Sequence, residues 1–154
     1  MKSYKELVAD CLPHINEVFP WELEDELKQN PDLLLIDINE PSEYSLAHIP
    51  RALNVPRGIL ESACDYGYDE TVPELAGGRK KAIVVICRSG NRSALAAMTM
   101  QQMGFSNIRS LKTGLRGWND NEGPLEDLDH NTIDPDIAEN YFITKLRPDQ
   151  EEPK

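Results

Sequence analysis

The sequence predicts an α/β fold in which helices cover both faces of a parallel sheet. The apolar run 82–86 is typical of a strand that is buried on both faces. A short polar segment and a run rich in Ala, Leu and Met follow it, and they are typical of a tight loop and a helix. A second apolar run at 33–38 has the same character as the first. Strands that alternate with helices imply right-handed crossovers and therefore a parallel sheet.

Apolar spacing and proline define the N-terminal elements. Apolar residues recur at helical spacing from Tyr4 to Ile15, with an interruption near Pro13, and a short strand is expected at 17–19. Pro20 opens a helix with acidic first turns, and Pro31 lies beyond its end. The later elements are predicted as strand 33–38, helix 42–46, strand 52–55, helices 59–66 and 72–76, a strand from 82, helix 93–103 and strand 108–111.

The loop after the strand at 82–86 carries the residues best suited to chemistry. Cys87 stands at the end of that strand. It is followed by Arg88, Ser89, Gly90, Asn91, Arg92 and Ser93, all of which are candidate anion-binding residues. Gly90 and Asn91 tolerate the positive φ of a loop that turns its N–H groups around an anion. The helix N-terminus and two arginines favour the thiolate, so Cys87 is a candidate nucleophile.

Two residues elsewhere are candidate supports for this loop. Asp37 ends a strand, and we expect it to orient a loop rather than to transfer protons. Arg57 also follows a strand, and we expect it to line the same mouth as Cys87. Ser93 is predicted to cap the helix. The alternative for Cys87 is inert packing, which two nearby arginines disfavour.

Three segments in this order resemble the single-domain rhodaneses, a family of sulfurtransferases. The loop CRSGNRS at 87–93 resembles the active-site loop of that family. The stretches 33–44 and 47–56 are similar to its strand–turn–strand signature, and 111–118 resembles its last strand and closing helix. The resemblance spans about residues 17 to 120. It implies a rhodanese-like three-layer fold, with a central five-stranded parallel sheet and helices on both faces.

The resemblance implies transfer of sulfane sulfur through a Cys87 persulfide. The expected donor is thiosulfate or a similar small anion, and the expected acceptor is cyanide or a thiol, with no metal or organic cofactor. Arg88 and Arg92 would stabilise the departing anion, with the larger part expected from Arg92. A sulfur-relay protein is a further expected partner. A sulfur-carrier or non-catalytic partner-binding role stays open as the alternative.

Phosphatases and arsenate reductases of the related fold form a second alternative. Their loops have the spacing Cys-x5-Arg, whereas Cys87 and Arg92 here have the spacing Cys-x4-Arg. The shorter ring disfavours phosphate, because loop geometry rather than fold decides which anion is bound.

The sequence departs from the family pattern at four positions. Asn39 stands where the family usually has an arginine, so the charge pairing of that arginine is expected to be lost. Ala47 and Arg51 stand where glycine is common, and Thr113 also occupies a position that is often glycine. Arg51 is a candidate to replace the missing charge.

Composition predicts one globular domain with two extensions. We expect a helical extension at 1–16, the rhodanese domain at 17–120 and an acidic extension at 121–154, where 10 Asp and Glu oppose 3 Lys and Arg. The usual state of such a tail is solvated, with a docking role as the alternative. Apolar residues interrupt it and leave open packing on the core or on a second subunit: Tyr141, Phe142, Ile143 and Leu146.

Charge and cysteine content limit the expected partners and compartment. The net charge of −11 argues against binding to nucleic acid and to anionic membranes. No apolar run is long enough to cross a membrane, and the N-terminus lacks a secretory signal. Three sparse cysteines fit a reducing compartment, with Cys11 and Cys64 in structural roles. We therefore expect a cytoplasmic monomer or homodimer.

Overall fold

The computed structural model describes all 154 residues and contains one five-stranded sheet with every strand parallel. The strand order is β1-β5-β4-β2-β3, which places β4 at the centre. The strands are β1 (Asn16–Val18), β2 (Leu34–Asp37), β3 (Leu53–Asn54), β4 (Ile83–Ile86) and β5 (Ile108–Leu111). The predicted parallel α/β sheet is confirmed.

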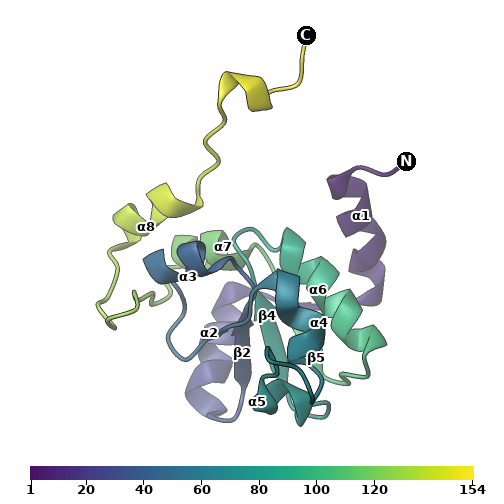
Figure 1. Ribbon diagram of the computed structural model, residues 1–154. Coiled ribbons are helices and arrows are strands. Elements are labelled where there is room, and N and C mark those ends of the chain that lie inside the picture. Colours follow the sequence, from purple (N-terminus) through teal and green to yellow (C-terminus); the bar gives the residue numbers. More distant parts are fainter.

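Helices lie on both faces of the sheet (Figure 1). The α-helices are α1 (Tyr4–Cys11), α2 (Pro20–Gln29), α3 (Pro41–Leu46), α4 (Leu60–Ala63), α5 (Pro73–Ala76), α6 (Asn91–Gln102), α7 (Gly114–Asp120) and α8 (Pro135–Phe142). Three short 3₁₀ helices cover Leu12–His14, Arg57–Ile59 and Pro148–Gln150. The predicted helix at 59–66 ends at Ala63, and its first turn is the 3₁₀ helix that starts at Arg57.

The side chains of β4 alternate between two hydrophobic cores. Ile83 and Val85 pack in the core under α1, α4, α5 and α6, whereas Val84 and Ile86 pack in the core under α2, α7 and α8. All four are buried, as expected for a central parallel strand with helices on both faces. The two cores hold the carboxyl end of β4 in place, and Cys87 follows directly.

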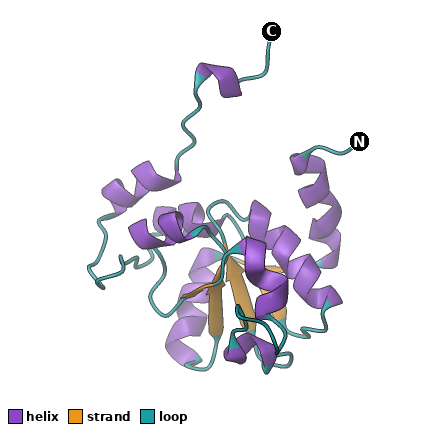
Figure 2. Ribbon diagram, in the orientation of Figure 1, coloured by secondary structure: helices purple, strands orange, loops and turns teal.

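The helices near both ends of the chain, α1 and α8, pack against the two cores of the sheet domain. Val8 of α1 belongs to the core under α6, and Phe142 of α8 belongs to the core under α7. Phe142 therefore packs on the core, whereas Tyr141 and Leu146 are exposed. The segment after α8 extends away from the body (Figure 2). Helix α8 was not predicted from the sequence. No helix combines the length and apolar character needed to span a bilayer.

Arg51 does not replace the missing charge near the Cys87 loop, so that expectation is wrong. Its guanidinium donates to the carbonyl oxygens of Pro31 at 2.9 Å and Leu33 at 3.1 Å, beyond the C-terminal end of α2. Its φ of 78° explains why glycine is common at this position in the similar family, because positive φ favours glycine.

Candidate active site

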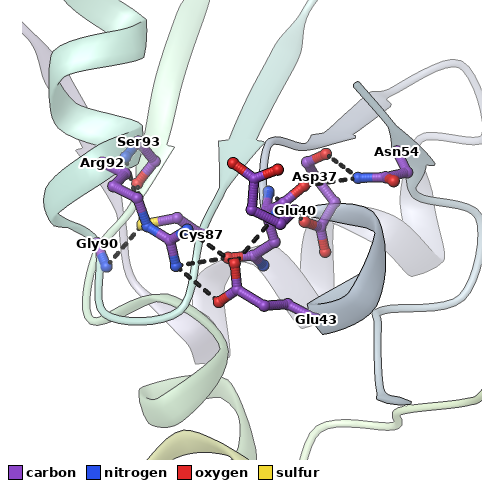
Figure 3. Close-up of polar contacts among 9 residues, drawn as sticks. Asp37, Glu40, Glu43, Asn54, Cys87, Gly90, Arg92 and Ser93 are labelled. Carbon is purple, nitrogen blue, oxygen red and sulfur yellow. Dashed lines mark hydrogen bonds and ion pairs between the residues drawn. The ribbon is translucent and has the colours of Figure 1, made fainter. Parts of the chain in front are cut away.

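Cys87 lies at the end of β4 with its sulfur enclosed by the start of α6 (Figure 3). The Sγ atom accepts hydrogen bonds from the backbone N–H groups of Gly90 at 3.1 Å and Ser93 at 3.3 Å. Gly90 is the N-cap of α6 and has φ 90°, which turns these N–H groups toward the sulfur. Two backbone donors and the positive end of a 12-residue helix stabilise negative charge at this atom.

Ser93 does not cap α6, so that prediction is wrong. The helix begins at Asn91, two residues earlier than expected, because Gly90 adopts the left-handed conformation that ends the loop. Ser93 is therefore inside the first turn and fully buried. Its Oγ accepts from the Cys87 thiol at 3.3 Å and lies 2.7 Å from Ser110 Oγ on β5. When Cys87 is a thiolate, the Ser93 hydroxyl can rotate to donate to the sulfur.

The first residues of helix α7 donate backbone hydrogen bonds to the Cys87 loop. Leu115 N–H donates to the Cys87 carbonyl at 2.9 Å, and Arg116 N–H donates to the Arg88 carbonyl at 3.0 Å. Gly114 allows this approach, because a Cβ atom there would lie 2.4 Å from the Cys87 carbonyl oxygen. Gly114 also has φ 60°, which disfavours any side chain. The resemblance identified this segment, but no sequence pattern indicated that it contacts the loop.

Arg92 forms an ion pair rather than standing free beside the sulfur. Its guanidinium donates to both carboxylate oxygens of Glu43 and to Asn39 Oδ1, all at 2.9 Å. The hydrogen bonds from Arg92 lower the pKa of Glu43 and, reciprocally, raise the pKa of Arg92. Asn39 thus takes part in a polar contact at the position where the similar family usually has an arginine. Arg92 joins α6 to α3, and Glu43 compensates most of its charge.

Asp37 is buried at the end of β2 and does not line the cavity above the loop. Its Oδ1 accepts from Asn39 N–H at 2.9 Å, while Oδ2 has no hydrogen-bond partner. Burial raises the pKa of Asp37 to about 7. Asn54 donates to the carbonyl oxygens of Asp37 and Asn39, both at 3.0 Å, and these bonds fix the turn into α3. The position agrees with a role in loop orientation.

Arg57 does not line the mouth above Cys87, so that expectation is wrong. Its guanidinium donates to Glu61 at 2.8 Å and to Thr99 at 3.3 Å. Thr99 lies about two turns along α6 from the loop, and Arg57 begins the 3₁₀ helix that follows β3. Arg57 therefore pairs with α4 and α6.

A cavity of about 600 Å³ lies above the loop. The loop contributes Arg88, Ser89, Asn91 and Arg92 to its lining. The other five lining residues come from four distant segments: Tyr4, Glu43, Arg116, Phe142 and Thr144. Sequence reasoning assigned none of these five residues to the site, because no local pattern brings α3, α7 and the chain ends together. Gly90 lines a neighbouring hollow together with Ser89 and Asn91. The fully buried Cys87 is in the lining of neither hollow.

The other two cysteines lie outside the site, as expected. Cys64 is buried, and burial raises the pKa of its thiol to about 11. Cys11 is half-buried at the end of α1. No three His, Cys, Asp or Glu side chains are placed to hold a metal ion.

The family comparison agrees with this geometry, since a model of the rhodanese-like domain matches residues 20–121. The chain belongs to the rhodanese-like domain family. The match covers strands β2 to β5, the Cys87 loop and helices α2 to α7. It leaves α1, β1 and α8 outside.

Three proteins illustrate what the chain is similar to. YrkF of Bacillus subtilis, named as a sulfur carrier, is 32% identical over 71% of this chain and 52% of its own length. The thiosulfate:glutathione sulfurtransferase of Saccharomyces cerevisiae is 29% identical over 66% of this chain and 75% of its own length. This chain therefore spans about half the length of YrkF.

The third similar protein is a solved structure from Rhodopseudomonas palustris. It is a protein of unknown function described as a possible tyrosine phosphatase, with 28% identity and a TM-score of 0.75. The match covers 82% of this chain and 96% of that one, so it extends beyond the segment matched by the family model.

Proposed function

We propose that this protein is a thiosulfate sulfurtransferase that carries sulfur on Cys87. The observation that supports this most strongly is the Sγ atom of Cys87, which accepts two backbone N–H groups at the start of α6. The same groups that stabilise a thiolate stabilise the negative charge of a persulfide. The names of the yeast and Bacillus subtilis relatives support sulfur transfer in general.

The proposed reaction is a double displacement. The Cys87 thiolate attacks the outer sulfur of thiosulfate, a new S–S bond forms, and sulfite leaves with the electron pair of the old S–S bond. An acceptor thiolate or cyanide then attacks the outer sulfur of the persulfide. The S–S bond to Cys87 breaks, and the thiolate of Cys87 is restored.

Arg88 is the guanidinium best placed to bind the donor anion. It lines the cavity and forms no ion pair in the structure, whereas Glu43 compensates Arg92. An uncompensated guanidinium attracts an anion more strongly than one already paired. We therefore assign donor binding chiefly to Arg88, and assign Arg92 to the positioning of the loop.

Two alternatives remain for the experiment to separate. A sulfur carrier would accept sulfur on Cys87 from a partner protein and pass it on, which the name of YrkF supports for that relative. A phosphatase agrees with the description of the Rhodopseudomonas palustris protein, but the Cys87–Arg92 spacing is one residue shorter than in phosphatase loops. The cytoplasmic location and the monomer or homodimer state stay predictions from the sequence.

Steady-state assays with thiosulfate and cyanide, and with p-nitrophenyl phosphate, test the proposal. We expect thiocyanate formation by the native protein, no thiocyanate from Cys87→Ser, and no phosphate release by either. The hydroxyl of serine is nearly isosteric but far less ionisable, so the variant should fold. Phosphate release that depends on Cys87 would favour the phosphatase. Sulfur transfer that persists in Cys87→Ser would exclude the proposed nucleophile.

A further inference from the structure

We infer that Glu43 is a specificity-determining residue of the Cys87 site, because its carboxylate occupies the face of Arg92 that would otherwise bind oxyanions such as sulfate and phosphate. Glu43 thereby acts as a built-in competitor against anions that have no sulfur to give. The inference rests on the proposed sulfurtransferase function and specifies how the site discriminates among small anions.

The proposed donor has close relatives that cannot react. Sulfate and thiosulfate are both dianions with a tetrahedral sulfur atom, and they differ only in that an oxygen of sulfate replaces the outer sulfur. Thiosulfate is captured at Cys87 by the new S–S bond, whereas sulfate gains non-covalent contacts alone. A site that bound oxyanions tightly would therefore be blocked by sulfate and phosphate without any gain for the reaction.

The guanidinium of Arg92 is already bound in the way in which it would bind an oxyanion. Its Nη1 donates to Glu43 Oε1 and its Nη2 to Glu43 Oε2, both at 2.9 Å (Figure 3). Nη2 also donates to Asn39 Oδ1 at 2.9 Å. Two parallel N–H···O bonds are the geometry in which a guanidinium recognises carboxylates and phosphates. The carboxylate of Glu43 thus takes the place of two oxygens of an anionic ligand.

The competing carboxylate is held in position by its own helix. Glu43 lies in the first turn of α3, where its Oε1 also accepts from Glu40 N–H at 3.1 Å. The hydrogen bonds from Arg92 lower the pKa of Glu43, so the carboxylate stays ionised at neutral pH. Because α3 and α6 fix the two partners, Glu43 is present at Arg92 at a high effective concentration. A free oxyanion has to displace it and leave a half-buried carboxylate without its partner.

The competition takes place in the wall of the cavity beside the loop. Both Arg92 and Glu43 line this cavity, together with Arg88 and Arg116. Arg88 and Arg116 form no ion pair, so they attract small dianions into the cavity. Release of Arg92 would add a third unpaired guanidinium, on the same loop as Arg88, and would turn this attraction into tighter binding.

An oxyanion bound by Arg92 would also lie next to the nucleophile. Arg92 directly precedes Ser93, whose backbone N–H donates to Cys87 Sγ at 3.3 Å. An unreactive anion at this place would hinder the approach of thiosulfate to the sulfur. The Glu43–Arg92 pair therefore keeps this approach open.

The test measures the binding of sulfate to the full chain by equilibrium dialysis, at an ionic strength fixed with sodium chloride. We expect Glu43→Gln to lower the Kd for sulfate about tenfold or more, because it frees one guanidinium for a charge-assisted bidentate pair. Sulfate should inhibit the thiosulfate–cyanide reaction of this variant at correspondingly lower concentrations. The Glu43 side chain is 34% exposed and glutamine has the same size, so the variant should fold.

Glu40→Gln is the matched control, because it removes the same charge from the start of α3. Glu40 is exposed, and its side chain does not contact Arg92. We expect the Kd for sulfate of this control to equal the native value. Glu43→Gln combined with Arg92→Ala should lose the gain in sulfate binding, since the freed guanidinium is then absent.

Three results would each overturn the inference: an unchanged Kd in Glu43→Gln, an equal gain in Glu40→Gln, or a gain that persists without Arg92. Sulfate binding does not depend on turnover, so these results are distinct from a failure of the proposed function. That failure would appear as a native protein that forms no thiocyanate, and it would remove the sulfurtransferase role even where the sulfate result stands.

Discussion

At the scale of single residues, Cys87 depends on close backbone packing as much as on neighbouring charge. Its sulfur accepts two N–H groups from the loop, and its carbonyl accepts a third from α7. The loop therefore cannot move without disturbing both the nucleophile and the closing helix. Gly114 is where this packing is closest.

Gly114→Ala should both destabilise the protein and reduce sulfur transfer. The added Cβ would lie 2.4 Å from the Cys87 carbonyl oxygen, at a residue with φ 60°. We expect a free energy of unfolding lower by about 2 kcal/mol and a turnover lower by at least tenfold. Gly58→Ala is the control, because a Cβ there meets no atom within 4 Å. Urea denaturation and the thiosulfate assay measure both effects. Equal behaviour of the two variants would contradict this account of the loop.

Alanine at Arg88 should chiefly change the KM for thiosulfate, whereas alanine at Arg92 should chiefly change the free energy of unfolding. Arg88 carries no ion pair, so Arg88→Ala should raise the KM for thiosulfate about tenfold with little loss of stability. Arg92→Ala leaves the half-buried Glu43 without its partner, and it should lower the free energy of unfolding by about 1–2 kcal/mol. Steady-state kinetics and urea denaturation of both variants check this division. A larger KM effect in Arg92→Ala would restore the donor-binding role that the sequence predicted for it.

Asp37 should make folding depend on pH. Its pKa is about 7 in the folded protein and near 3.8 when exposed, so the folded state holds a proton that the unfolded state releases. Stability from this group is therefore greatest below about pH 4 and falls as pH rises toward 7, by at most about 1.4 kcal/mol per pH unit. Urea denaturation from pH 4 to 8 should show a smaller decline for Asp37→Asn. Parallel pH curves for the two proteins would contradict the raised pKa.

At the scale of elements, the two terminal helices complete both the cores and the cavity. Helix α1 places Val8 in one core and Tyr4 at the cavity, while α8 places Phe142 in the other core and at the same cavity. The extensions at 1–16 and 121–154 that the sequence predicts lie almost wholly outside the segment matched by the family model. Their separation from the domain stays a prediction. In packing, helices α1 and α8 of these extensions belong to the body, whereas the segment after α8 does not.

Phe142→Ala measures how strongly α8 is docked. Phe142 is 6% exposed within the core that contains Trp118, so its removal leaves a cavity. We expect a loss of about 3 kcal/mol in the free energy of unfolding. Tyr141→Ala is the neighbouring control, since Tyr141 is 37% exposed and should cost much less. Similar losses in both variants would mean that α8 is not held by Phe142.

Local sequence patterns predicted the helices and strands well, but they did not predict which side chains from different elements contact each other. The run 82–86 and the loop 87–93 carry their own signals, so the strand, the loop and the nucleophile could be predicted together. The partner of Arg92 is Glu43, 49 residues away, and only the register of β2 beside β4 brings them together. Ser93 was misassigned as a cap because the left-handed Gly90 starts the helix two residues early.

The outer wall of the site could not be predicted for the same reason. Tyr4 and Phe142 approach the loop from opposite ends of the chain, and each looked like an ordinary apolar residue of a helix or tail. The backbone N–H groups of Leu115 and Arg116 contact the loop, and Gly114 is the only local signal of this close approach. Tertiary packing alone brings these three residues to one cavity.

At the scale of the whole molecule, an acidic protein has a cationic cavity beside the loop that carries its nucleophile. The net charge is −11, yet Arg88, Arg92 and Arg116 gather where β4 meets α6 and α7. Such a cavity concentrates small anions near Cys87, while the rest of the surface repels polyanions. This distribution fits an anionic sulfur donor.

The central claim is that Cys87 carries sulfur as a persulfide, and intact-mass measurement tests it most directly. The native protein is incubated with thiosulfate and freed of excess donor. Its intact mass is then measured before and after addition of cyanide. The account predicts a gain of one sulfur atom that cyanide reverses and that Cys87→Ser lacks. A native protein whose mass does not change with thiosulfate, or a gain that Cys87→Ser retains, would contradict it.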